Sequence, residues 1–434
     1  MTELDNRVNI TVQIQDVTVT RPGFGILAIV HKHQQSALAR VQTYTDLAGL
    51  LLDFPSYTPV GKFATIVFSQ AFVPETVKVI KRDVAETMTA ALDAAVLVDN
   101  DFYAVATPSK LTADIQAGAA WTLANKKFFG YSTPDPNAIT SATTDDFSLL
   151  QALSNNRAAG WYSDDAGGEF EIDTVTVAGT VATADVTGFG SVPVEVGDTF
   201  GIWTSAVSAL NAIWTVATIG ALEFTFTVPS GTSSDVATSD AWFDYNLLEA
   251  AIFGKMLPQD AGAKTWDIQQ LAAVTPDNIP GTAQTNLGGK SGNWFSTIAS
   301  LNVTSGLKTG GGGGKTASGR YIDIQRGADW LSVNLQLDLF ALMVNEGGDL
   351  GYDAIGFQKV ETTIATRLND GLDKGFLTPF VSGTFVGLDY NIAMPNLADI
   401  PQADKTARLL EGIQINANIR GKIHNMEATL TLST

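Results

Sequence analysis

Residues 167–240 differ in pattern from the rest of the chain, and this difference is the strongest constraint on the fold. The stretch is dense in Thr, Val, Gly and Ala and has almost no helical periodicity. Its apolar residues occupy short runs separated by Gly and Ser turns, which is typical of a small β-sandwich or barrel. Strand and helix patterns alternate on either side of it. We therefore predict an all-β, sandwich-like module inserted at an exposed loop of an α/β domain.

The residues around this module predict the α/β domain itself, over 22–166 and 241–257. Apolar runs that follow turn residues predict strands, and periodic segments that begin at a capping residue predict helices. We expect strands at Phe24–Val30, Val77–Ile80, Phe102–Ala106 and Ala158–Tyr162, and helices from a cap at Thr45 to Leu52 and at Ala85–Val98, Thr112–Asn125, Phe147–Leu153 and Tyr245–Phe253.

A third unit is expected over 258–422, with an α+β composition. A short alternation predicts a strand at Arg320–Gln325, and further strands are expected within 385–392 and 413–419. A helix is expected from the cap at Asp353 to Lys374, with Gly375 as its stop.

The helix expected over Asp329–Asn345 is apolar on two sides. A helix that is apolar nearly all round is buried, either by its own domain or by a neighbour. Its two apolar sides consist of Trp330, Val333, Leu337 and Phe340 on one, and Leu331, Leu335 and Leu342 on the other.

Both ends of the chain alternate strictly between apolar and polar residues, which predicts a strand with one buried face at each end. A terminal strand can pair with the sheet edge of a neighbouring molecule, or it can complete a sheet of its own chain. We define residues 1–21 and 423–434 as the N-terminal and C-terminal arms. Their alternating apolar residues are Val8, Ile10, Val12 and Ile14 in the first arm and Met426, Ala428, Leu430 and Leu432 in the second.

The composition excludes several classes of function. The chain has no cysteine, so disulfides, thiolate catalysis and cysteine-ligated metals are excluded. Its formal net charge of −19 disfavours direct binding to nucleic acid, because phosphates would be repelled. No apolar run is long enough to cross a bilayer, and residues 1–10 lack the pattern of a signal peptide, so we expect no membrane insertion and synthesis in a cytoplasm. His31 and His33 read as a surface pair rather than a metal site.

A glycine-rich segment, Thr309–Thr316, resembles a phosphate-binding loop only in part. Gly314, Lys315 and Thr316 fit the end of that motif, but Thr309 occupies its leading glycine position. The segment also lacks the expected buried strand before it and helix after it, and Gly289-Lys290-Ser291 is a weaker near-miss. Asp145-Asp146 and Asp164-Asp165 lack the spacing of a calcium loop, and Asp145 suits a helix N-terminus. We expect no catalytic residues, no metal and no cofactor.

Three basic residues share one side of the helix predicted before Gly375. Lys359, Arg367 and Lys374 fall within about 80° of one another at about 100° per residue. In a strongly acidic protein this basic stripe could bind an acidic partner. The alternative is a solvated face with local ion pairs to Asp370.

The order of several short segments resembles that of contractile tail sheath proteins of bacteriophages, in a divergent myovirus family. The resemblance covers the chain except for about 167–240, and no single motif in it is decisive. The segments are Tyr44–Leu47, Phe68–Gln70, Pro74, Val77–Val79, Phe102-Tyr103, Ile115, Trp121, Lys126–Phe129, Lys264–Asp267, Leu271, Val274–Pro276, Arg320–Leu331 and Phe340–Leu342.

The resemblance implies a structural role without enzymatic activity. Sheath subunits form stacked sixfold rings around a tail tube, with the C-terminal domain facing the tube, and contract to drive the tube through the host envelope. It implies partners in further copies of the chain, the tube, the baseplate and the tail terminator, and a place in the virion tail. It also implies that the arms add strands to neighbouring subunits and that Lys359, Arg367 and Lys374 face the tube. The alternatives are a nucleotide-hydrolysing enzyme that uses Gly314-Lys315-Thr316, and another tail, baseplate or adhesin protein.

Overall fold

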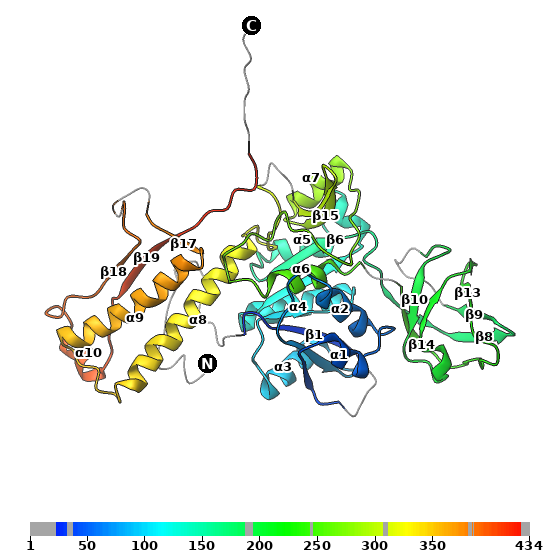
Figure 1. Cartoon of the computed structure of the whole chain (residues 1–434), viewed down its shortest axis with the longest axis horizontal. Helices are drawn as coiled ribbons and strands as arrows, with labels where there is room; N and C mark the ends of the chain where they lie inside the picture. Colours follow the sequence, from blue (N-terminus) through cyan, green and yellow to red (C-terminus); the bar gives the residue numbers. More distant parts are fainter. Residues whose placement is uncertain are drawn as a thin grey trace, which may run out of the picture. The chain divides into compact units, whose positions relative to one another are not determined.

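The structure, a computed structural model, describes residues 23–32, 38–186, 194–243, 246–306, 311–380, 384 and 386–426 (Figure 1). The chain forms two compact units. We call Gly23–Gln259, Trp266–Tyr321 and the residues from His424 onward the sheet unit, and Asp260–Thr265 with Ile322–Ile423 the hairpin unit. Among the described residues, no helix combines the length and apolarity needed to span a bilayer.

An eight-stranded sheet forms the centre of the sheet unit, in the order β16-β15-β6-β5-β4-β1-β3-β2. Its inner neighbours are parallel, whereas β2 and β16 pair antiparallel at the two edges. The inner strands are nearly continuous apolar runs, as strands covered on both faces require. The strands are β1 (Leu27–Lys32), β2 (Val41–Tyr44), β3 (Val77–Arg82), β4 (Ala104–Ala106), β5 (Phe128–Thr133), β6 (Ala158–Tyr162), β15 (Asn293–Ile298) and β16 (Leu301–Ser305).

Helices cover both faces of this sheet. Alternate side chains of each strand point to opposite faces, and in β5 and β6 the side chains on both faces are buried. On β5, Phe129 and Tyr131 join the core formed with α3, α4, α5 and α7. Phe128, which precedes Phe129 and so points to the opposite face, instead contacts Phe253 of α6, with the ring centroids 6.1 Å apart. The helices are α1 (Leu47–Asp53), α2 (Pro59–Phe68), α3 (Met88–Val98), α4 (Thr112–Asn125), η1 (Pro136–Ile139), α5 (Asp146–Ala152), α6 (Leu248–Met256) and α7 (Gly281–Gly289).

Between β6 and α6 the chain forms two four-stranded antiparallel sheets, ordered β11-β10-β14-β7 and β12-β13-β9-β8 (green in Figure 1). Their inner faces share one apolar core, in which the ring of Phe200 lies edge-on to those of Phe224 and Phe226. This arrangement is a β-sandwich. Its elements are β7 (Glu169–Ile172), β8 (Thr174–Ala178), β9 (Val181–Asp185), β10 (Thr199–Ile202), η2 (Ser208–Leu210), β11 (Ile213–Thr215), β12 (Thr218–Ile219), β13 (Glu223–Thr227) and β14 (Ser239–Phe243).

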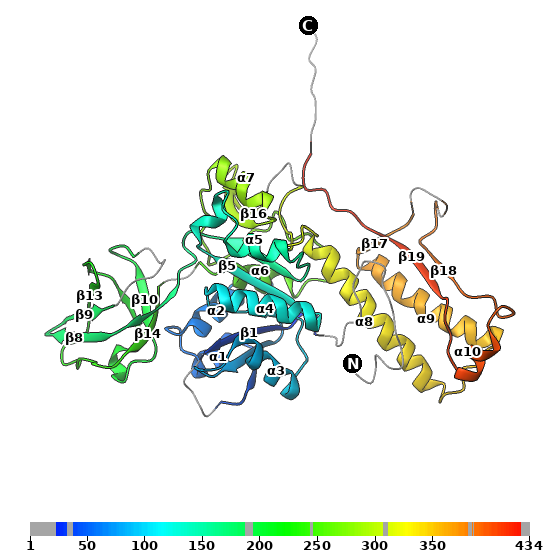
Figure 2. The ribbon, with the colours of Figure 1, turned by 180° about the vertical axis from the view of Figure 1, so that it is seen from behind.

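Two long helices, α8 (Ile322–Asn345) and α9 (Ala354–Asp373), dominate the hairpin unit. They lie side by side in both Figure 1 and Figure 2. Their facing apolar residues pack together with a small antiparallel sheet ordered β17-β19-β18, so the unit is α+β. The sheet and the remaining helix are β17 (Leu377–Thr378), β18 (Tyr390–Ala393), α10 (Gln402–Ala407) and β19 (Gln414–Ile419).

The strand predicted at Arg320–Gln325 is wrong, because α8 begins at Ile322. The six residues of this segment resemble a strand in isolation, but the helical periodicity of the next twenty residues extends backwards from Gln325 to Ile322. The predicted cap at Thr45 is also displaced by one residue, since the Asp46 side chain accepts the Gly49 amide at 2.8 Å. The cap at Asp353 is confirmed.

The two units divide the chain differently from the expected domains. Residues 266–321, expected in a C-terminal unit, supply β15 and β16 to the eight-stranded sheet instead. Their apolar runs were too short to reveal which sheet they join. The expected strand within 385–392 forms only at its end, as β18.

Candidate assembly surface and chain ends

The three residues of the predicted basic stripe lie on or just after α9, and each forms an ion pair within the hairpin unit. Lys359 Nζ lies 2.5 Å from Glu346 Oε2, just beyond the end of α8. Lys374 Nζ lies 3.2 Å from Asp370 Oδ1 and 3.6 Å from Asp260 Oδ1. The stripe is therefore neutralised by acids of its own unit.

Arg367 makes the most directional of these contacts. Its Nε and a terminal nitrogen bind the two carboxylate oxygens of Asp338 at 2.7 and 3.0 Å, and its other terminal nitrogen binds Asp370 at 2.7 Å. The guanidinium also lies 5.5 Å from the ring centroid of Trp330 on α8. Hydrogen bonding to Asp338 raises the pKa of Arg367 above its ordinary value. The predicted pairing with Asp370 is confirmed, whereas Asp338 lies on another helix and sequence spacing could not reveal it.

The two apolar sides of α8 have different surroundings. Leu331, Leu335 and Leu342 pack into the core that α8 shares with α9. Leu337 and Phe340 stay half-buried outside that core, and Val344 is 59 % exposed. Leu337, Phe340 and Val344 recur at helical spacing and so share one side of the helix, which we call the α8 apolar face. The hairpin unit therefore buries one predicted apolar side and leaves part of the other open.

The second residue of the C-terminal arm, His424, is held by contacts within its own chain. His424 Nδ1 lies 2.9 Å from the Gly311 carbonyl oxygen and 3.6 Å from Asp267 Oδ2, and its ring lies edge-on to Tyr321. Two residues later Met426 is 86 % exposed, and Ile423–Met426 is not a strand. The other predicted arm residues lie outside the described residues: Val8, Ile10, Val12, Ile14, Ala428, Leu430 and Leu432.

Backbone amides of the glycine-rich segment, which would have to bind a nucleotide phosphate, are instead hydrogen-bonded within the chain. The Lys315 amide donates to Asn293 Oδ1 at 2.9 Å, and the Thr316 amide donates to the Arg320 carbonyl at 2.8 Å. Burial lowers the pKa of Lys315, and the Asp267 carboxylate accepts the Gly313 amide. A loop that already holds a carboxylate is a poor phosphate site, although a strand (β16) and a helix (α8) do flank it, contrary to expectation.

Other residues singled out in the sequence have structural roles. Asp145 caps α5 and binds Lys290 of the second near-miss motif, with 2.7 Å between Oδ2 and Nζ. His31 is buried, and its Nε2 bonds the Glu169 carboxylate on β7, so the prediction that it lies on the surface is wrong. The tertiary fold covers β1 where the sequence alone showed no covering element. A further buried ion pair, which the sequence did not reveal, joins Lys110 to Glu249 of α6, with 2.9 Å between Nζ and Oε1.

Comparison with solved structures places the fold of the whole chain. It matches a chain in the baseplate of the anti-feeding prophage at 12 % identity and a TM-score of 0.58, with 96 % of this chain and 95 % of that chain covered. It matches the helical sheath of the same particle in its contracted state at 12 % identity and a TM-score of 0.56, with 98 % and 100 % covered. A chain in the baseplate of the same particle in its contracted state matches at 13 % identity and a TM-score of 0.54, with 100 % of this chain and 99 % of that chain covered. No protein-family model and no curated protein matches the sequence. The chain thus has the fold of contractile tail sheath proteins.

Proposed function

We propose, from the premise that this chain has a tail sheath fold, that it is the structural subunit of a phage contractile tail sheath. Copies polymerise as stacked sixfold rings around a tail tube, and the sheath contracts to drive the tube through the host envelope. The observation that carries this proposal is the match over 98 % of this chain and the whole of a chain in a contracted helical sheath. The subunit is then a virion component, and its partners are further copies, the tube, the baseplate and the tail terminator.

Contraction in this proposal needs no nucleotide. The energy comes from a difference in buried interface between two packings of the same subunits. The pairing of the Gly311–Thr316 backbone within its own chain supports a mechanism without nucleotide hydrolysis.

The two arms connect neighbouring subunits by strand addition. Main-chain hydrogen bonds between an added strand and a sheet edge tolerate rigid-body motion of the domains that they link. In the C-terminal arm, the anchored His424 and the exposed Met426 support a fixed root followed by a segment that is available to a neighbour. We propose that Val8, Ile10, Val12 and Ile14 pair with one neighbour, and Met426, Leu430 and Leu432 with another.

The hairpin unit faces the tube. The stripe of Lys359, Arg367 and Lys374 remains our proposed contact, although an acidic partner must compete with the acids that already bind it. The α8 apolar face adds a second, uncharged contact surface. A row of half-buried and exposed apolar residues on one side of a helix is typical of a surface that a partner covers.

Electron microscopy of the purified chain, alone and with its tube protein, tests this proposal. We expect wide hollow cylinders around tubes. Removal of 427–434, which retains His424, should leave a folded subunit that forms no cylinder. Removal of 1–21 should have the same effect. Cylinders of normal length from both trimmed proteins would contradict strand exchange, and failure of the complete chain to form cylinders with its tube would contradict the sheath assignment.

A pair of substitutions tests the α8 apolar face. Phe340→Glu with Val344→Glu should abolish assembly without unfolding the subunit, because neither side chain belongs to the buried core. Leu97→Glu on α3 is the matched control, since Leu97 is 87 % exposed and apolar but lies in the other unit. Equal assembly of the double variant and the wild type would exclude this face as a contact.

A further inference from the structure

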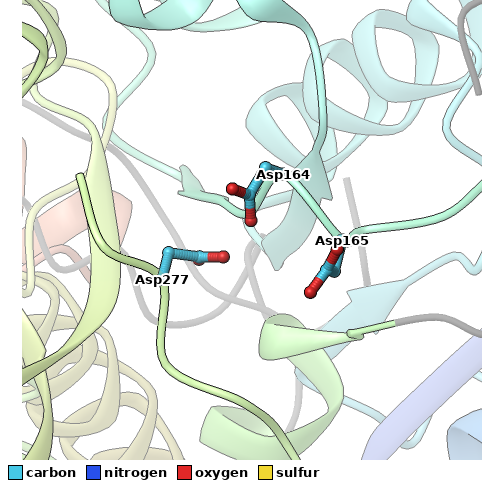
Figure 3. Close-up of side chains that lie close together, drawn as sticks. All are labelled: Asp164, Asp165 and Asp277. Atoms are coloured by element: carbon cyan, nitrogen blue, oxygen red, sulfur yellow. The ribbon is translucent and has the colours of Figure 1, made fainter. Parts of the chain in front are cut away.

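Three carboxylates converge where the chain leaves the eight-stranded sheet for the β-sandwich. Asp164 and Asp165 follow the end of β6, and Asp277 lies on the segment that precedes α7. One carboxylate oxygen of each lies within 4.8 Å of those of the other two. Figure 3 shows Asp277 pointing toward Asp164 from the opposite segment. Like charges at this separation repel, so the cluster is stabilised either by a shared proton or by a bound cation.

The burial and incomplete hydrogen bonding of Asp277 also point to a bound ligand. Asp277 is 6 % exposed, and its Oδ2 has no hydrogen-bond partner among the described residues. Its Oδ1 accepts from the Ser163 hydroxyl at 3.1 Å, and its carboxyl also forms a hydrogen bond with the Asp164 carboxyl. In the described part of the chain, neither Asp164 nor Asp277 forms an ion pair with a lysine, arginine or histidine. When both carboxyls are ionised no proton links them, and a buried carboxylate oxygen without a donor then needs a ligand.

The surrounding backbone holds the two acidic segments together. The Asn246 side-chain amide donates to Ser163 Oγ at 2.8 Å and to the Thr275 carbonyl at 2.9 Å. The Asn246 backbone amide donates to the Asp165 carbonyl at 2.9 Å, and the Thr275 amide donates to Asn246 Oδ1 at 3.0 Å. The Asp277 amide donates to Phe295 of β15 at 2.8 Å. The positions of the carboxylates are therefore set by the fold rather than by the cluster itself.

We propose that Asp164, Asp165 and Asp277 bind one divalent cation of the calcium class. Carboxylates are the ligands that hard divalent cations prefer, and calcium binds oxygens at about 2.3–2.6 Å. Two ligands on opposite sides of such an ion are about 4.6–5.2 Å apart, which accommodates the observed spacing. Water completes the coordination on the side of Asp164 and Asp165, which are exposed.

The position of the site indicates that a bound cation would stabilise the connection between the eight-stranded sheet and the β-sandwich. Asp164 and Asp165 begin the connection into the β-sandwich, and Asn246 lies on the connection that returns from it. Asp277 belongs to the segment that is bonded to β15 of the eight-stranded sheet. The bound ion joins these segments and stabilises the root of the inserted sandwich. This inference is independent of the proposed sheath function.

Terbium luminescence with the complete chain tests the site, because Tb³⁺ substitutes for Ca²⁺ and is excited by nearby tryptophan. Trp294 lines the same pocket as Asp277. We expect sensitised emission that saturates at one ion per chain and is displaced by Ca²⁺, with a Kd of about 10⁻⁵–10⁻³ M for Ca²⁺. Ca²⁺ should also raise the melting temperature of the wild type.

Two variants and a control separate this site from general attraction to an acidic surface. Asp277→Asn should abolish saturable binding and the Ca²⁺-dependent rise in melting temperature. Asp164→Asn should weaken the affinity for Ca²⁺ by about 10–100-fold or more. Asp164 is exposed, so this substitution should leave the fold intact. Glu171→Gln, an exposed acid on β7 outside the cluster, should bind as the wild type does. Absence of saturable binding in the wild type, or unchanged binding in Asp277→Asn and Asp164→Asn, would overturn the proposal.

Discussion

Arg367 on α9 and Asp338 on α8 form a two-point ion pair, with Nε to Oδ2 at 2.7 Å and a terminal nitrogen to Oδ1 at 3.0 Å. The planar guanidinium fits the carboxylate at both points, so the contact fixes the helices relative to each other within the hairpin unit. A stripe that reads as a free basic surface in the sequence is therefore also part of the packing between two helices.

A charge swap across this pair separates folding from tube binding. Arg367→Asp alone should lower the free energy of unfolding by about 1–2 kcal/mol, because it places like charges together on a partly exposed surface. Asp338→Arg with Arg367→Asp should recover most of that loss, as measured by urea unfolding. A double variant no more stable than the single variant would show that the pair adds nothing to stability. If Arg367 contacts the tube, the swapped protein should fold but assemble poorly around it, whereas normal assembly would count against that contact.

The pH dependence of stability should change when the Asp277 carboxyl is removed. Burial, followed by the proximity of Asp164, raises the pKa of Asp277 to about 9. The folded state therefore holds a proton that the unfolded state has released above about pH 4, so this group lowers stability progressively as the pH rises from about 4 toward 9. Asp277→Asn is neutral throughout, and its amide can still donate to Asp164.

We expect Asp277→Asn to match the wild type near pH 4 and to become more stable than it at higher pH, by about 1.4 kcal/mol per pH unit at most. Urea unfolding with a chelator present measures this difference. Burial also raises the pKa of Asp146, to about 6, but that group is common to both proteins and cancels in the comparison. Parallel stability curves across pH would contradict the raised pKa of Asp277.

Two helical glycines should respond oppositely to alanine. A Cβ on Gly61 in α2 would overlap the Pro55 carbonyl oxygen and lie 2.5 Å from that of Phe54, and these backbone atoms cannot move aside cheaply. We expect Gly61→Ala to destabilise the protein by about 1–3 kcal/mol. A Cβ on Gly49 in α1 would meet nothing closer than Asp46 Oδ1 at 3.5 Å, so Gly49→Ala should be neutral or stabilise by up to about 1 kcal/mol. Thermal unfolding distinguishes them, and equal shifts would refute the steric argument.

Local sequence patterns predicted strands and helix caps, whose formation depends mainly on residues close together in the sequence. The short apolar strands of 167–240 form two packed sheets, and the α9 helix begins at its predicted cap, Asp353. Periodicity identifies such elements because one buried face repeats every 2 or 3.6 residues. The same reasoning failed at Arg320–Gln325, where a six-residue strand pattern was weaker than the periodicity of the long helix that occupies most of it.

By itself, the sequence determined the strand and helix alternation around an all-β stretch at 167–240, the absence of cysteine chemistry and the resemblance to tail sheath proteins. Only the tertiary structure decided which side chains meet. It brought Asp338 to Arg367, Asp267 to the glycine-rich loop and Asp277 to Asp164, in each case across at least 25 residues. Charge pairing and burial act through distance in space, and a single sequence records only distance along the chain.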